Sequence, residues 1–152
     1  MYSRQEASHV RKEFWTALGQ YLKPVLSAEG TRINWINYRT GVRHFHFRLD
    51  AIDARAFISL ELDHPDTELQ GLYFEQLKSM EGIFQVIMDE KWDWQQLQTS
   101  VHGKLVSRVV REIDGAKVLN RNHWPVLISF FKERIIKLDR FWTEVKDQFL
   151  YQ

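Results

Sequence analysis

The feature that most constrains the fold is a long apolar stripe near the end of the chain. Its members recur at steps of three and four residues, which is the spacing of one face of an α-helix. They are Trp124, Ile128, Phe131, Ile135, Leu138, Trp142, Val145 and Phe149. With Asn122 as its cap, the helix would span about 29 residues, or about 43 Å. A compact chain of 152 residues has a diameter of about 38 Å. The stripe therefore predicts either a helix that covers a sheet across the whole domain or the seam of a homodimer.

The rest of the chain predicts one α+β domain that spans residues 1–152. Ser3 and Glu6 have the spacing of a helix cap, and Pro24 predicts the end of that first helix near residue 23. Alternation and β-branched content predict strands at 32–38, 42–50, 54–62, 92–98 and 104–112, and periodicity predicts a second helix at 67–90. The expected order is α-β-β-β-α-β-β-α. It predicts a mostly antiparallel sheet that helices cover on one face.

Strand 42–50 alternates between polar and apolar side chains, and paired strands must share that alternation. A three-residue turn that ends at Gly41, in the left-handed conformation, would join it to strand 32–38. The pairs expected on the polar face are Arg32–Arg48, Asn34–His46, Asp50–Arg55, Arg48–Phe57, His46–Ser59 and His44–Glu61. The side chains expected on the apolar face are Ile33, Trp35, Phe45, Phe47, Leu49, Ile58, Leu60 and Leu62.

The polar face of this sheet holds the candidate site. Paired arginines bind phosphate and carboxylate groups well. The predicted anion- or ligand-binding residues are Arg32, Asn34, His46 and Arg48. Further contact residues predicted on this face are His44, Phe57, Ser59 and Glu61. Arginine and aromatic side chains together also suit a protein interface, while one side of an antiparallel sheet is commonly just solvated. Both interpretations stay open.

No catalytic residue, metal site or cofactor is predicted. The order of the first elements matches restriction-endonuclease-like folds, which hold Mg²⁺ with an Asp and an (Asp/Glu)-x-Lys motif. Asp50 and Glu61 are the candidates, but Asp63 stands where lysine is expected. The expected register also separates Asp50 from Glu61 by about 20 Å. His44 and His46 have the spacing of metal ligands, yet this pattern on a strand is not specific.

Composition sets the remaining limits. The net charge is only +1 and there are no cysteines, so the chain has no basic field for nucleic acid and no disulfide. A modest set of basic and aromatic side chains leaves nucleic-acid binding as a weakly supported alternative. It comprises Arg32, Arg39, Arg43, Arg48, Arg55, Tyr38 and Phe57. The first residues contain no apolar stretch typical of a signal peptide, and the longest apolar run, 126–131, is too short to cross a bilayer. We therefore expect a cytoplasmic protein without a membrane segment.

Four segments resemble a bacterial family known only as a domain of unknown function. They are EFWTALGQY (13–21), INWINYRTG (33–41), SLELDHPD (59–66) and WPVLISFFKERIIKLDRFW (124–142). The resemblance covers nearly the whole chain. It implies a domain that stands alone or is attached to nuclease-like domains, with an accessory role near nucleic-acid or defence systems. The element order is also similar to that of type III secretion chaperones, which are dimeric binding proteins.

These observations favour a non-enzymatic binding or assembly domain that forms a homodimer and contacts a protein partner. The expected contact surface is the polar sheet face or the last helix. The alternative is a degenerate or metal-dependent restriction-nuclease-like protein.

Overall fold

The computed structural model describes residues 2–100 and 102–150, and it confirms a mixed α+β architecture with an antiparallel sheet. Its longer elements, in chain order, are α1 (Arg4–Leu22), β1 (Phe45–Ile52), β2 (Arg55–Leu62), α2 (Thr67–Lys78), α3 (Glu81–Met88), β3 (Asp93–Thr99), β4 (Leu105–Asp114) and α4 (Trp124–Val145). Two 3₁₀ turns, Arg121–His123 and Lys146–Gln148, flank α4. The Ser3 hydroxyl accepts the Glu6 N–H at 3.1 Å, so the predicted cap of the first helix is confirmed.

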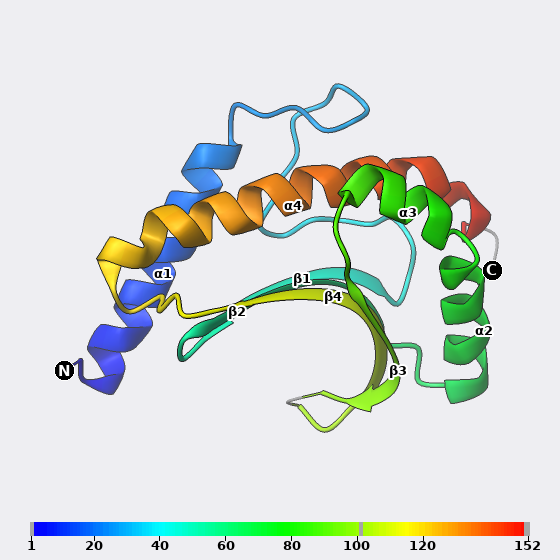
Figure 1. Cartoon of the computed structure of the whole chain (residues 1–152), viewed down its shortest axis with the longest axis horizontal. Helices are drawn as coiled ribbons and strands as arrows, with labels where there is room; N and C mark the ends of the chain where they lie inside the picture. The colour runs from blue at the N-terminus through cyan, green and yellow to red at the C-terminus, as the bar shows by residue number, and fades with distance from the viewer. Residues whose placement is uncertain (1, 101, 151–152) are drawn as a thin grey trace.

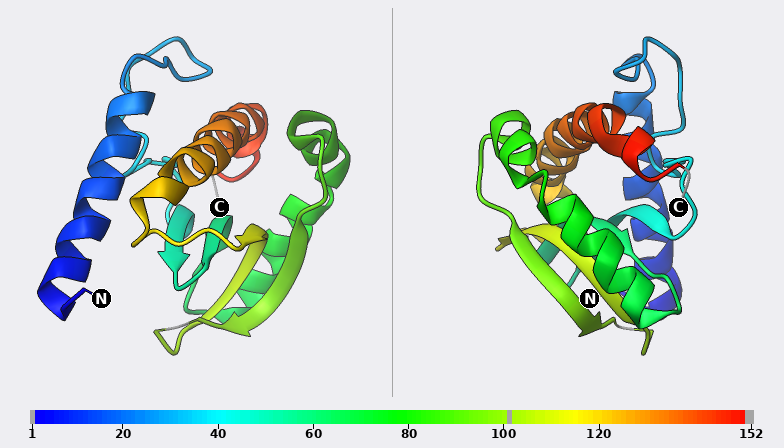
Figure 2. Two further views of the ribbon diagram at one scale, coloured as in Figure 1. Left: turned by 60° about the vertical axis from the view of Figure 1, so that its left-hand side comes forward. Right: turned by 90° about the vertical axis from the view of Figure 1, so that its right-hand side faces the viewer.

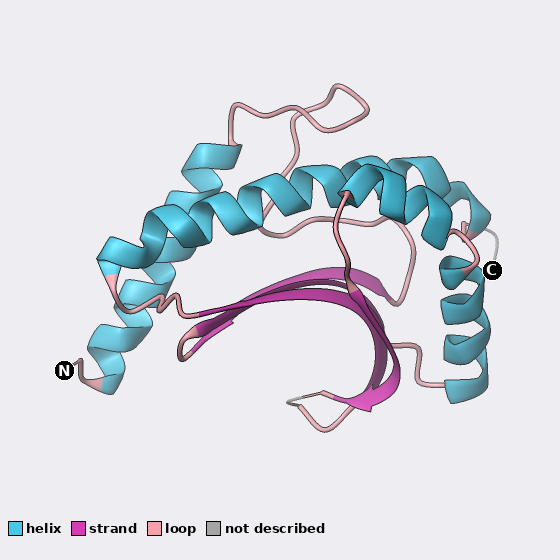
Figure 3. Cartoon of the chain, in the orientation of Figure 1, coloured by secondary structure: helices cyan, strands magenta, loops and turns pink. Residues whose placement is uncertain are grey.

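The four strands form one sheet in the order β1-β2-β4-β3, with every neighbouring pair antiparallel. The sheet is strongly curved, and the helices lie on its convex side (Figures 1 and 3). Turned views show the same separation, with α4 above the sheet and no helix on the concave side (Figure 2). The prediction of helices on one face is therefore confirmed.

The apolar stripe of α4 faces the core of its own domain. Six members of the stripe are almost fully buried, namely Phe131, Ile135, Leu138, Trp142, Val145 and Phe149. They pack with apolar side chains of β1 and β2, including Phe45, Phe47, Ile58, Leu60 and Leu62. These six members of the stripe are thus on the side of the helix that covers the sheet, as one of the two predicted alternatives requires, whereas Trp124 and Ile128 at its start are only partly buried.

A β-bulge bends the outer part of the sheet. The register between β3 and β4 shifts between Gln95 and Gln98, and Leu97 has a left-handed φ of 50°. The Ser107 hydroxyl accepts the Leu97 N–H at 3.0 Å and donates to the Gln70 side chain of α2 at 2.6 Å. Because a bulge increases local bending, this hydrogen-bonded link to α2 fixes how β3 curves at the edge of the sheet.

The predicted strand at 32–38 is wrong, because this segment is part of a loop between α1 and β1. Its aromatic residues anchor the loop instead of pairing in a sheet. Tyr38 stacks on the Phe47 ring, with centroids 4.0 Å apart, and donates to the Asp139 carboxylate of α4 at 2.5 Å. Asp139 is only 3% exposed and also accepts the Ala28 N–H at 2.8 Å. Packing of the aromatic rings on α4 and β1 therefore outweighs the β propensity of the segment. Gly41 does adopt the predicted left-handed conformation, with φ 79°.

The register between β1 and β2 is shifted by two residues from the predicted one. Asp50 pairs with Phe57 rather than Arg55, and Arg48 pairs with Ser59 rather than Phe57. The cause is a tight turn in which Asp53 adopts φ 54°. Pairing between the strands therefore continues as far as Ile52 and Arg55, whereas the predicted pairing ended at Asp50. A shift of two residues leaves every side chain on its predicted face.

The predicted helix 67–90 is broken into α2 and α3. The Ser79 hydroxyl donates to the Gln76 carbonyl at 2.5 Å, and such local hydrogen bonds compete with helix continuation. The two helices then cover different neighbours, since α2 packs on β3 and β4 and α3 packs on α4. Gln70, Phe74 and Leu77 form the buried side of α2, whereas Leu69 and Leu72 are 36% and 61% exposed. No described helix is long and apolar enough to span a membrane.

Tyr38 provides a pH-dependent test of how the loop is anchored. Burial, together with the hydrogen bond to Asp139, raises the pKa of the Tyr38 phenol well above its ordinary value of 10.0. Below pH 10 we expect Tyr38→Phe to lower the free energy of unfolding by about 1–2 kcal/mol, because the bond to a buried carboxylate is lost. As the pH rises above 10, the phenol ionises in the unfolded chain but stays protonated in the folded one. The wild type then loses stability by up to about 1.4 kcal/mol per pH unit.

The difference between wild type and Tyr38→Phe should therefore shrink above pH 10 in urea unfolding curves. Tyr2→Phe is the control, because Tyr2 is 42% exposed and does not line the α1–α4 groove. A difference that stays constant up to pH 11 would contradict this role of the Tyr38 phenol.

Candidate functional site

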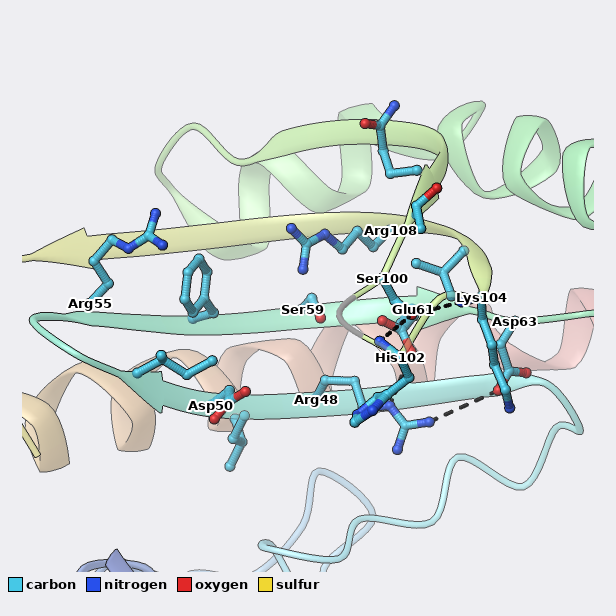
Figure 4. Close-up of a pocket in the computed structure, with 16 residues that line it drawn as sticks. Arg48, Asp50, Arg55, Ser59, Glu61, Asp63, Ser100, His102, Lys104 and Arg108 are labelled. Carbon is cyan, nitrogen blue, oxygen red and sulfur yellow. Dashed lines mark hydrogen bonds and ion pairs between the residues drawn. The ribbon is translucent and has the colours of Figure 1, made fainter. Parts of the chain in front are cut away.

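The concave face of the sheet carries a cleft of about 610 Å³. It lies on the side that no helix covers, and its far wall is formed by the end of the β3–β4 hairpin (Figures 1 and 4). The charged residues that line it are Arg48, Asp50, Arg55, Glu61, Asp63, Lys104 and Arg108. Phe57, Ser59, Gln98, Ser100 and His102 complete much of the remaining wall. Its volume is within the range of about 300–1,000 Å³ that is typical of ligand clefts.

A row of polar residues crosses all four strands through this face. His46 of β1 lies opposite Glu61 of β2, Glu61 opposite Arg108 of β4, and Arg108 opposite Gln95 of β3. Directly opposed residues share a face of the sheet, so the row follows from the alternation of each strand. The sheet register therefore brings the sequence-predicted His46 and Glu61 together.

The carboxylates at the β1 end of the cleft are paired. The Arg48 guanidinium contacts Glu61 at 3.1 Å and Asp63 at 3.9 Å. Asp63 also lies 3.2 Å from the His44 ring and 3.0 Å from the His46 ring. The two carboxylates are largely buried, with 14% and 15% of each side chain exposed. This end of the cleft is an ion-paired cluster.

The β4 side of the cleft, one strand away from Glu61, holds cations that form no ion pair with a carboxylate of the described residues. The Arg108 Nε donates to the Gln95 side-chain oxygen at 2.9 Å. Within residues 2–100 and 102–150, neither Arg108 nor Lys104 forms an ion pair. Sequence reasoning recognised strand 104–112 but did not assign its faces. The signal was present, since Lys104 and Arg108 are four positions apart and thus share a side of the predicted strand 104–112.

The structure does not assemble the predicted group of four ligand residues. Arg32 and Asn34 are in the loop before β1, where the Arg32 guanidinium donates to the Lys23 carbonyl and the Asn34 side chain accepts the Asn37 N–H. His46 and Arg48 are on β1, in the ion-paired cluster described above. The predicted pairs Arg32–Arg48 and Asn34–His46 are therefore wrong, because the strand that would have formed them does not exist.

The other predicted contact residues lie on the expected face of the sheet. The Arg55 guanidinium lies 5.4 Å from the centre of the Phe57 ring, and both side chains line the cleft. Ser59 also lines the cleft but is 2% exposed. His44 precedes β1 and contacts Asp63. Of this set, Phe57 and Glu61 are the members that combine a place in the cleft wall with partial exposure.

The acidic residues do not form the nuclease arrangement. Asp50 lies opposite Phe57 and Glu61 opposite His46, so the two acids are four positions apart along the hairpin, or about 13 Å. Asp63, in the place of the expected lysine, is held by two histidines. Among the residues that the structure describes, no three His, Asp or Glu side chains are grouped so that they could hold a metal ion.

Residues 10–146 match the model of a protein family described as Domain of unknown function (DUF4268). The chain belongs to this family. The match confirms the resemblance to a family of unknown function, and it covers every element from α1 to α4 at least in part. No curated protein and no solved structure matches the chain significantly.

The contact between Arg48 and Glu61 gives a test of the register. We expect a double-mutant cycle with Arg48→Ala and Glu61→Ala to show a coupling of about 0.5 kcal/mol in the free energy of unfolding. The value is small because the Arg48 side chain is 52% exposed. Arg48→Ala combined with Glu112→Ala is the matched cycle and should show no coupling, since Glu112 instead pairs with Arg55. Equal coupling in the two cycles would contradict the observed register.

Proposed function

We propose that this DUF4268 domain is a non-enzymatic binding domain that receives a protein partner in the concave face of its sheet. The observation that carries the proposal is the cleft itself, an uncovered sheet face with side chains from all four strands and the end of the β3–β4 hairpin around one volume. Arginine and aromatic side chains, which are enriched at protein interfaces, come together there as Arg48, Arg55, Arg108 and Phe57. A cytoplasmic location and an accessory role near nucleic-acid or defence systems belong to this proposal.

The alternative of a restriction-nuclease-like protein has less support. Its signature needs two acids and a lysine around one metal ion. Here the acids Asp50 and Glu61 are spread along the hairpin, and the cation nearest to Glu61 is the Arg48 guanidinium, which forms an ion pair with it. A degenerate relative of such enzymes would still be compatible with a binding role.

Site-specific photo-crosslinking tests the binding face. A photoreactive benzoylphenylalanine in place of Arg55, in the cleft, should form adducts with another protein in the cells that naturally contain this chain. The same substitution at Lys12, exposed on α1, is the matched control and should form none of these adducts. Absence of adducts from the cleft position, or identical adducts from both positions, would contradict the proposal. Protease sensitivity of the added mass identifies the partner as protein.

We also propose that the domain forms a homodimer through a second surface. A groove of about 810 Å³ runs between α1 and α4. Its apolar lining consists of Ala17, Tyr21, Trp124, Pro125, Ile128 and Ile136. A rim that carries both Lys132 and Glu133 suits a second copy, because two-fold symmetry places the same surface on both subunits and each charge can face its opposite.

Light scattering tests this assembly. We expect a mass of two chains for the wild type and of one chain for Ile128→Glu, which places a charge in the apolar groove. Val126→Glu is the control, because Val126 is 57% exposed on α4 and does not line the groove. A wild-type protein that remains a monomer at all concentrations would refute the homodimer.

A further inference from the structure

The charges of the concave cleft are unevenly compensated. Its lining includes four cations and three acids, as given above. Arg48 is paired with Glu61 and Asp63, and Arg55 is paired with Glu112, 3.4 Å away. This leaves Lys104 and Arg108 as the cations for which the described part of the chain supplies no ion pair. The uncompensated positive charge is therefore concentrated where β4 meets the hairpin end.

Arg108 is held in place without being neutralised. Its side chain is half-buried, and the bond from its Nε to the uncharged Gln95 amide fixes the guanidinium. Glu61 lies directly opposite Arg108 in the sheet, yet its carboxylate contacts Arg48 instead. An arginine that is positioned through Nε keeps its other N–H donors available, and those donors match the two oxygens of a carboxylate.

Lys104 extends the positive surface along the hairpin end, where His102 lies beside it in the cleft wall. Both line the cleft and both are exposed. The Ser100 hydroxyl accepts the backbone N–H groups of His102 and Lys104 at 3.3 Å, which gives this end a defined turn. Figure 4 shows Ser100, His102 and Lys104 together on this wall, facing the strands that carry Glu61 and Arg108.

The same charges argue against a nucleic acid as the occupant. A phosphate backbone presents a continuous row of negative charge, and it would meet Asp50, which has no ion-pair partner among the described residues and lines the same cleft. Single strands are also bound by stacking on exposed aromatics, whereas Phe57, the aromatic residue of the lining, lies beneath the Arg55 guanidinium. A polypeptide can place carboxylates only where the cations are.

We infer that the partner of the concave cleft is an acidic polypeptide segment whose carboxylates pair with Arg108 and Lys104. The inference rests on the proposed binding function and names the chemistry of its partner. Uncharged residues of the segment would then lie over Asp50 and the ion-paired cluster around Asp63.

Fluorescence anisotropy with synthetic probes tests this inference on the full chain. The probes are a labelled octapeptide of alternating glutamate and serine, the same peptide with glutamine for glutamate, and an octathymidylate. We expect binding of the glutamate peptide, with much weaker binding of the glutamine analogue. The affinity should fall strongly between about 50 and about 500 mM NaCl, because exposed charges are screened.

The variant Lys104→Glu/Arg108→Gln should weaken binding of the glutamate peptide by at least about tenfold. Lys104→Glu alone, at an exposed position, should weaken it several-fold and provides a second variant if the double variant does not fold. Lys12→Glu makes the same charge reversal on α1 and should change the affinity less than about twofold.

Three outcomes would overturn the inference. They are no binding of the glutamate peptide, unchanged binding in both cleft variants, and tighter binding of the octathymidylate than of the peptide. If the proposed binding function itself is wrong, the result is different: the crosslinking experiment gives no adducts at the cleft position. Adducts with a partner that lacks an acidic segment would leave the binding function in place and refute the inference alone.

Discussion

The burial of one side of α4 against the convex side of the sheet is the contact on which the rest of the structure depends. It removes several of the largest fully buried side chains from water, including Trp142 and Phe131. Because α2 and α4 cover that side of the sheet, and α1 and α3 pack on α4, the opposite side of the same strands is left to polar residues. The concave face is therefore open because the helices bury the other face of the sheet. Side-chain alternation then places the charged residues of β1, β2 and β4 on this open face.

A second contact with α4 decides where the first part of the chain lies. The Trp142 indole donates to the Thr40 carbonyl at 2.8 Å, and the Thr40 hydroxyl donates to the Phe45 carbonyl at 2.7 Å. Together with the buried Asp139, these bonds hold the loop 23–44 on the helix side of β1. A segment rich in aromatic and β-branched residues is therefore used to bind a loop to a helix, and the sheet begins only at Phe45.

Sequence alone was sufficient for the fold class, for the face that each residue of β1 and β2 occupies and for most helix and strand positions. These features depend on the periodicity of apolar and polar residues, which is local and can be read from the sequence. The pairing of particular residues was not predictable, because two registers that differ by two residues bury the same apolar side chains. The choice between them is made by the left-handed Asp53 in the turn, and aspartate adopts that conformation only in a minority of turns. For the candidate site, His46 and Arg48 were placed on the correct face. Arg108 was overlooked because its neighbours come from strands distant in sequence.

The hydrogen bonds from Gln70 through Ser107 to Leu97 connect two sides of the molecule that share no surface. Gln70 belongs to a helix on the convex side, whereas the strand that contains Leu97 leads into the hairpin end that walls the cleft. The Ser107 hydroxyl both accepts and donates a hydrogen bond in this link, and the Gln70 amide group also donates to the carbonyls of His64 and Leu105. The strand that leads into the cleft wall is therefore anchored, through side chains of the sheet, to a helix that does not itself line the cleft.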